Sequence, residues 1–176
     1  MTDYRRYFVP GGTYFFTATL ADRSLPLLTE NTAALRAAFR HVRAEMPFVV
    51  DAIVVLPDHL HTIWVLPPGD SDFSTRWKKL KAAFSRQLPR VKHLSESRTR
   101  KGERGIWQRR FWGHALRDEA DWQRHMDYIH FNPVRHGHVR RTADWPYSSF
   151  HRYVKLGVYP HEWGDVHEEN AGAYGE

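Results

Sequence analysis

The stretch FVVDAIVVLPDHLHTIWVL, which spans Phe48–Leu66, decides the fold that the sequence predicts. Its first half, Phe48–Leu56, is a nearly continuous run of apolar and β-branched residues, and such runs favour strands. After a Pro57-Asp58 turn, His59–Leu66 gives a second run of the same kind. Two runs separated by so short a turn are typical of antiparallel strands. We therefore expect an antiparallel pair of strands here.

The flanking segments predict alternating strands and helices. Upstream, Thr13–Leu20 is rich in aromatic and β-branched residues, and Ala33–Glu45 has apolar residues at helical spacing before Pro47 ends the helix. Downstream, the pattern predicts, in chain order, a helix over Thr75–Leu88, a mobile polar loop from Pro89 to Gly105, a strand over Ile106–Leu116, a helix from Asp118 to about Phe131 that stops near Asn132-Pro133, and a short helix over Tyr147–Leu156.

The order of these elements, β-α-β-β-α-β followed by a further helix, is that of a ferredoxin-like fold. We expect an α+β chain whose antiparallel sheet has helices on one face, with an additional C-terminal helix. The 176 residues leave room for one core, so residues 1–160 are expected to form a single domain. Residues 161–176 are expected to form an acidic C-terminal tail, because the chain has no Lys or Arg beyond Lys155.

The basic residues gather in one part of the chain. The sequence has 26 Lys and Arg against 20 Asp and Glu, a formal net charge of +6. The window 76–110 holds thirteen of these cations and two acids, so it carries +11 and the remainder carries −5. So concentrated a charge suits a polyanion such as nucleic acid, although a solvated basic surface has the same composition. The candidates for phosphate contact in this window are Lys78, Lys79, Arg109 and Arg110.

The absence of cysteine excludes disulfides, thiolate zinc sites and cysteine nucleophiles. Any bound metal must then use His, carboxylate, amide or phosphate ligands. No apolar run approaches the roughly 18 to 20 residues that cross a bilayer, and Met1–Pro10 lacks the apolar stretch of a signal peptide. A cytoplasmic protein with no membrane partner is therefore expected.

Two histidines stand at the start of the second strand of the predicted pair. Because side chains alternate across a strand, His59 and His61 point to the same side, and their Cα atoms are roughly 6.5 to 7 Å apart. Both rings can then reach one cation. The alternative is a pair of polar residues satisfied by water or backbone. A second His-x-His, His136-Gly137-His138, lies in a basic segment and is interpreted as a phosphate contact or as surface.

The segment HMDYIHFNPVRHG, residues 125–137, is the second candidate for chemistry. Tyr128 and Asn132 are four residues apart, so they share a face of the predicted helix while it persists. That face can offer a phenol nucleophile beside a neutral amide ligand, with His125 one turn earlier as a possible base. The alternative is that Tyr128 packs in the core and Asn132 ends the helix before Pro133.

Four segments together resemble those of the REP-associated tyrosine transposases, which are relatives of the single-tyrosine HUH transposases. They are LPDHLHTIW at 56–64, the Trp107-Gln108 pair, YIHFNPV at 128–134 and DWPYSS at 144–149. The order and spacing of all four make the resemblance specific, and it extends from about Tyr14 to Tyr153.

This resemblance implies a ferredoxin-like fold and a metal-dependent HUH tyrosine transposase of the IS200-like type. It implies that Tyr128, on the additional helix, is the catalytic nucleophile. It also implies that His59, His61 and Asn132 bind Mg²⁺ or Mn²⁺, with Asn132 where relatives often carry Gln. The implied substrate is single-stranded DNA with hairpin structure, which is cleaved and rejoined through a 5′-phosphotyrosine intermediate by a monomer or a homodimer.

Two other functions use the same residues differently. A non-catalytic hairpin DNA- or RNA-binding module would keep the fold and the basic charge after losing the chemistry. A metal-dependent nuclease that uses water would need His59 and His61 but not Tyr128. Attack by a tyrosine conserves the energy of the phosphodiester bond, so rejoining needs no ATP.

Overall fold

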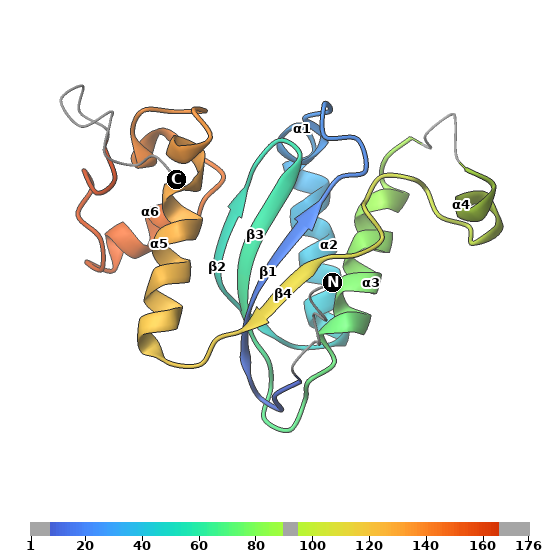
Figure 1. Cartoon of the computed structure of the whole chain (residues 1–176), viewed down its shortest axis with the longest axis horizontal. Helices are drawn as coiled ribbons and strands as arrows, with labels where there is room; N and C mark the ends of the chain where they lie inside the picture. The colour runs from blue at the N-terminus through green and yellow to red at the C-terminus, as the bar shows by residue number, and fades with distance from the viewer. Residues whose placement is uncertain (1–7, 90–94, 166–176) are drawn as a thin grey trace, which may run out of the picture.

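The computed structural model describes residues 8–89 and 95–165 of the chain. At its centre is a four-stranded antiparallel sheet in the order β2-β3-β1-β4 (Figure 1). The strands are β1 (Thr13–Thr19), β2 (Val49–Val55), β3 (His59–Val65) and β4 (Trp112–Ala115). The predicted antiparallel pair is β2 and β3, so that prediction is confirmed. β3 pairs on both of its sides and lies in the interior of the sheet.

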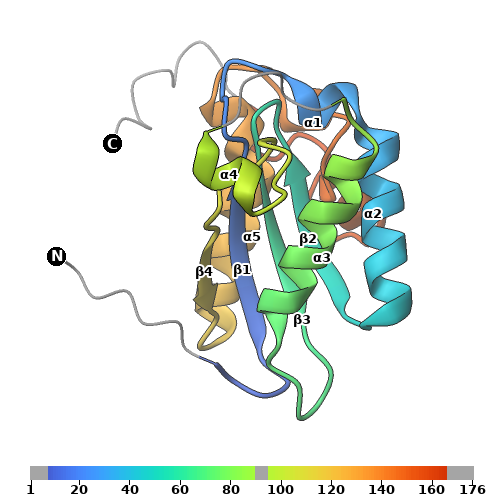
Figure 2. The same cartoon turned by 90° about the vertical axis from the view of Figure 1, so that its right-hand side faces the viewer.

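One face of the sheet is covered by two helices, α2 (Thr32–Glu45) and α3 (Phe73–Arg86), which lie side by side in both views (Figures 1 and 2). Their apolar residues meet every second residue of the strands. Trp64 of β3 stacks on Trp77 of α3 with ring centroids 4.4 Å apart, and Phe16 of β1 contacts both rings. This core fixes the two helices on the sheet.

The opposite face of the sheet is covered by α5 (Glu119–Arg135) and by α6 (Phe150–Lys155) (Figure 1). The alternate strand residues, including Phe15 and Ile63, point to this side and pack against Ile129 of α5. The sheet therefore has helices α2 and α3 on one face and the additional C-terminal helix on the other. The predicted ferredoxin-like α+β fold is confirmed.

The stretch from Pro89 to Gly105 differs from its prediction as a mobile loop. Residues 90–94 lie outside the described residues, and the remainder contains the short helix α4 (Glu96–Arg100). Two arginines tie this stretch to its surroundings, because Arg98 donates to the Trp107 carbonyl and Arg104 to the Leu88 carbonyl. Two further short elements are α1 (Leu27–Glu30) and the 3-10 helix η1 (Thr142–Asp144).

Two predicted boundaries also differ. The strand expected over Ile106–Leu116 is interrupted, and only β4 is a continuous strand. Upstream of β4, Trp107 forms an antiparallel bridge to Leu20, and the side chains of Ile106 and Trp107 are buried in the core with α3. The helix expected to stop near Asn132-Pro133 continues to Arg135. Pro133 has no N–H to donate, but the chain keeps helical bonding beyond it, since the His136 N–H donates to the Asn132 carbonyl. Within the described ranges, no helix combines the length and apolar character needed to cross a membrane.

Candidate active site and nucleic-acid interface

The two strand histidines lie side by side on the face of the sheet that α5 covers. The ring centroids of His59 and His61 are 4.9 Å apart, and both residues are buried, with 6% and 5% of their surface exposed. The structure therefore brings together the pair that the strand alternation predicts. We call His59 and His61 the histidine pair.

Each ring of the histidine pair is held by a hydrogen bond at Nδ1. Asp58 Oδ1 lies 2.7 Å from His59 Nδ1, and the hydroxyl of Thr17 lies 2.7 Å from His61 Nδ1. Nε2 is then the nitrogen that each ring presents to a ligand. This is the usual arrangement of metal-binding histidines, in which a second partner fixes the orientation of the ring.

The histidine His61 is held in its neutral form. Burial, together with the neighbouring His59 and His136, lowers the pKa of His61 from 6.5 to about 3. A neutral imidazole has the free nitrogen lone pair that a metal ion requires. At neutral pH the ring is therefore in the form that binds metal.

Tyr128 lies on α5 directly beside this pair. Its ring centroid is 5.1 Å from that of His61, in an edge-on arrangement, and 5.9 Å from that of Phe15. The residue is 38% exposed, so the alternative in which it packs in the core is excluded. The guanidinium of Arg135 lies 5.8 Å from the ring centroid of Tyr128, within reach of an anion bound there.

Asn132 lies one helical turn beyond Tyr128 and is fully buried. Neither its Oδ1 nor its Nδ2 has a hydrogen-bond partner in the described part of the chain. A buried polar group without a hydrogen-bond partner destabilises the folded state by about 1–3 kcal/mol. Such unpartnered groups are therefore rare in protein interiors. The amide therefore has the properties of a ligand whose partner is a bound group.

Some neighbours of the site were missed by sequence reasoning. The ring of His136, at the end of α5, lies 5.3 Å from that of His59, and burial lowers its pKa. Its spacing of four residues from Asn132 is a signal that could have found it. Asp58 precedes His59 in the same motif, whereas Thr17 comes close only through the pairing of β1 with β3, for which the sequence gives no local signal.

A basic groove of about 800 Å³ lies between α3, α4 and the segment 101–111. Its walls carry cations and aromatic rings together. The cations are Lys78, Lys81, Arg86, Arg98, Lys101, Arg104 and Arg109, and the rings are those of Trp77, Trp107 and Phe111. The cations can hold a phosphate backbone. The rings of Trp77 and Trp107 are buried, so of the three rings the half-buried one of Phe111 has surface on which a base can stack.

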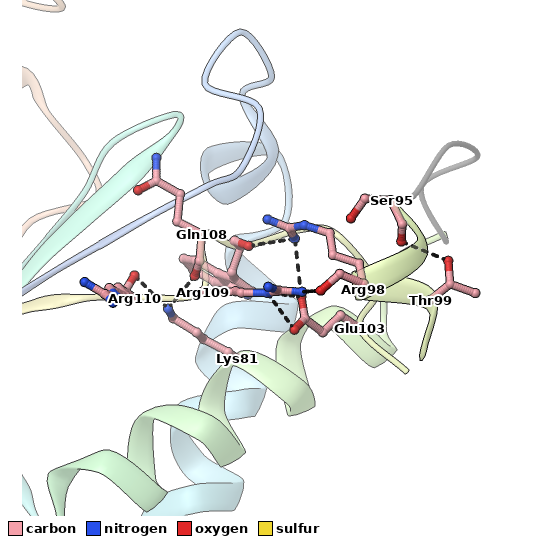
Figure 3. Close-up of polar contacts among 10 residues, drawn as sticks. Lys81, Ser95, Arg98, Thr99, Glu103, Gln108, Arg109 and Arg110 are labelled. Atoms are coloured by element: carbon pink, nitrogen blue, oxygen red, sulfur yellow. Dashed lines mark hydrogen bonds and ion pairs between the residues drawn. The ribbon is translucent and has the colours of Figure 1, made fainter. Parts of the chain in front are cut away.

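The walls of the basic groove are held by polar contacts between distant segments (Figure 3). Arg109 Nε donates to both carboxylate oxygens of Glu103, at 2.9 and 3.1 Å, and Arg109 Nη2 donates to the Ser97 hydroxyl at 2.9 Å. Lys81 on α3 donates to the carbonyl of Gln108 at 2.9 Å. These contacts join α3, α4 and the segment that leads to β4.

The four predicted phosphate contacts lie in different surroundings. Lys78 and Arg109 line the basic groove. Lys79 points from α3 toward α2 and forms an ion pair with Glu45. Arg110 is exposed next to the groove, where its backbone carbonyl lies 3.4 Å from Lys81 Nζ.

Comparison with known proteins gives full-length relatives. The "REP-associated tyrosine transposase" of Escherichia coli (strain K12) is 46% identical over 173 residues, which cover 98% of this chain and 97% of the relative. A relative in Haemophilus influenzae with a closely similar name is 47% identical over 165 residues, covering 93% of this chain and 94% of the relative. No family model matches the chain.

A solved structure also resembles this chain over its whole length. It is described as the structure of a REP-associated tyrosine transposase bound to a REP hairpin. The TM-score is 0.80 at 44% sequence identity, and the match covers 100% of this chain and 98% of the other.

Proposed function

This chain belongs to the REP-associated tyrosine transposases, and from that membership and the site described above we propose that it cleaves and rejoins single-stranded DNA beside a hairpin. The observation that carries the proposal is the approach of Tyr128 to the histidine pair, with ring centroids of Tyr128 and His61 5.1 Å apart. A nucleophile beside a cation site is an arrangement that can carry out phosphodiester transfer.

The proposed partner is hairpin DNA, bound by a monomer or a homodimer. The solved relative is bound to a REP hairpin, which supports the same kind of ligand for this chain. The basic groove supplies cations for the phosphates. Lys78, Arg109 and Arg110 are proposed to contact the DNA backbone, and Lys79 to make a weaker contact because it is paired with Glu45.

The residues of the site fit a divalent metal ion, Mg²⁺ or Mn²⁺. The ligands proposed are Nε2 of His59, Nε2 of His61 and the amide oxygen of Asn132. Two features support this set: the Nδ1 atoms of both rings are already bonded, and the buried amide of Asn132 has no partner among the described residues. When bound, the ion would supply positive charge to the phosphate oxygens and to the leaving 3′ oxygen.

Tyr128 is the proposed nucleophile. Its phenol oxygen forms a bond to phosphorus while the bond from phosphorus to the 3′ oxygen breaks, which leaves a 5′-phosphotyrosine and a free 3′-OH. The phenol proton is released and the 3′ oxygen takes up a proton. Attack of a 3′-OH on the phosphotyrosine then rejoins the DNA. Arg135, beside the ring of Tyr128, is proposed to contact the phosphate during both steps.

The test is a cleavage assay with a labelled single-stranded hairpin and Mn²⁺, analysed on a denaturing gel. The expected product is a covalent protein–DNA band that Tyr128→Phe removes and the control Tyr147→Phe retains. Free cleaved ends that survive Tyr128→Phe would instead identify a nuclease that uses water. Tight binding of the hairpin with no product would identify a binding module, and either result would overturn the proposal.

A further inference from the structure

A second cluster of metal-type ligands lies apart from the histidine pair. His114 on β4 faces Asp121 and His125 in the first turns of α5. His114 Nε2 is 2.9 Å from one carboxylate oxygen of Asp121, and His125 Nδ1 is 3.3 Å from the other. We call these three residues the β4–α5 cluster.

The spacing of the β4–α5 cluster is close to that of a coordination shell. One ligand atom from each residue lies within 4.8 Å of the other two. In a tetrahedral zinc site with bonds of about 2.0–2.1 Å, neighbouring ligand atoms are about 3.3 Å apart. The 2.9 and 3.3 Å contacts of His114 and His125 end on different oxygens of the Asp121 carboxylate. His125 Nδ1 also lies 2.8 Å from the backbone carbonyl of Asp121, so the His125 ring must rotate away from that carbonyl to bind an ion through Nδ1.

The chemistry of the three ligands favours Zn²⁺. Two imidazoles and one carboxylate form the kind of three-ligand set that binds zinc and leaves a fourth position open. The side chain of Asp121 is only 4% exposed, whereas those of His114 and His125 are 31% and 19% exposed. The cluster thus combines a desolvated carboxylate with rings that solvent can reach, which gives an ion a path of entry.

The cations near Asp121 are able to move away. Arg117 and Arg124 approach the carboxylate at 3.6 and 3.3 Å, but their side chains are 73% and 63% exposed. Because these two guanidinium groups extend into solvent, they remain hydrated when they move off the carboxylate. A divalent ion can therefore displace them.

The β4–α5 cluster is a neighbour of the active site and not a part of it. The ring of Phe15 separates the two, with its centroid 4.7 Å from that of His125 and 5.5 Å from that of His61. We propose that His114, Asp121 and His125 form a second, zinc-binding site. The bound ion would link the edge strand β4 to the start of α5, the helix that carries Tyr128.

The test measures zinc binding to the β4–α5 cluster alone, in a variant that lacks the histidine pair. The full-length double variant His59→Ala/His61→Ala, stripped of metal with a chelator and dialysed, is titrated with Zn²⁺ by calorimetry. It is expected to bind one equivalent. Adding His114→Ala or, independently, His125→Ala is expected to weaken binding by more than the roughly 10- to 100-fold that follows loss of an outer partner.

Controls distinguish a metal site from a hydrogen-bond network. His41→Ala changes a histidine on α2 and is expected to leave the zinc affinity unchanged. Arg124→Gln removes a cation that competes with the metal ion, so it is expected to increase the zinc affinity. A cluster that is only a hydrogen-bond network would show no such increase. Circular dichroism without metal checks that each variant is folded.

Two results would overturn the zinc site. The first is a double variant that binds no Zn²⁺. The second is a zinc affinity that neither His114→Ala nor His125→Ala changes. The outcome does not depend on DNA cleavage, so the second site and the proposed transposase activity can fail separately.

Discussion

Asn132 carries two buried polar atoms that have no hydrogen-bond partner in the described ranges. Leucine has nearly the same branched shape and has no polar atoms. We predict that Asn132→Leu, measured by urea unfolding in the presence of a chelator, raises the free energy of unfolding by about 1–3 kcal/mol. The same change is expected to abolish strand cleavage, because it removes one of the three proposed metal ligands.

Asn132→Gln is the matched control for that prediction. It keeps the amide and is expected to retain more cleavage than Asn132→Leu, without the gain in stability. A leucine variant that is less stable than the parent would show that the amide of Asn132 has partners of its own in the fold.

Thr17 provides a second prediction for a single residue. Its hydroxyl bonds Nδ1 of His61, and Thr17→Val removes that bond while keeping a β-branched side chain in β1. We expect the affinity for Mn²⁺, measured by calorimetry, to fall about 10- to 100-fold. Thr19→Val, the same change two residues along the strand, is expected to have little effect, and equal losses in both variants would contradict a specific role for Thr17.

The stability of the helix α5 depends on the cap at its N-terminus as well as on its packing against the sheet. Asp118 caps the helix by accepting a hydrogen bond of 2.7 Å from the Asp121 N–H. Asp118→Ala is expected to lower the free energy of unfolding by about 1 kcal/mol, whereas Asp118→Asn, which can also cap, is expected to retain most of it. Chemical unfolding measures both, and an equal loss in the two variants would argue against capping.

The sequence predicts those elements whose patterns are local. The pairing of β2 with β3 follows from two β-branched runs and a turn. The approach of Tyr128 to His61 is a contact between distant segments, and it is expected only from the resemblance of the motifs to those of the REP-associated tyrosine transposases. The end of α5 could not be predicted in this way. The local rule for Pro133 ends the helix there, but packing of α5 on the sheet keeps it helical to Arg135.

Contacts between distant segments could not be predicted either, because they are set by tertiary packing and not by a local pattern. Thr17 meets His61 only because β1 pairs with β3, and His114 meets His125 only because β4 lies beside α5. Neither contact is set by a spacing along the chain. A single sequence therefore revealed the motif residues of the site but not the residues that support them.

At the scale of the whole molecule, one buried cation joins several segments. Arg76 of α3 is 1% exposed, and its guanidinium bonds the carbonyls of Met46 and Pro47 and the carboxylate of Asp70, the last at 2.6 Å. The hydrogen bond from Arg76 lowers the pKa of Asp70. A carboxylate whose pKa is lower in the folded state stabilises the fold above its unfolded pKa, about 3.9, and this contribution is lost as the pH falls through the folded value.

Asp70→Asn is therefore expected to destabilise the protein at pH 7 by about 2 kcal/mol. The value lies below the roughly 3–5 kcal/mol for breaking a fully buried pair, because the side chain of Asp70 is 32% exposed. The difference from the parent should shrink as the pH falls below 4. Urea unfolding at pH 7 and pH 3 measures it, and a difference that stays constant with pH would exclude the ion pair as its cause.

The charge of the basic groove leads to a prediction about DNA binding. Lys78 lines the groove, whereas its neighbour Lys79 is paired with Glu45. Lys78→Ala is expected to weaken hairpin binding at low salt and to reduce the slope of log affinity against log salt by about 1. Lys79→Ala is expected to change the hairpin affinity and the salt slope less than Lys78→Ala does. Fluorescence anisotropy over a salt series measures the two, and a larger effect of Lys79→Ala would place the DNA elsewhere.

The position of β3 inside the sheet has a consequence for how the site opens. Because β3 is hydrogen-bonded to β1 on one side and β2 on the other, His59 and His61 can separate only when the sheet itself unfolds. Their backbone amides should then exchange with deuterium as slowly as global unfolding permits. α5 rests on one face of that sheet and can detach by a smaller fluctuation, so rising denaturant should disable strand transfer by releasing Tyr128 before the imidazoles part.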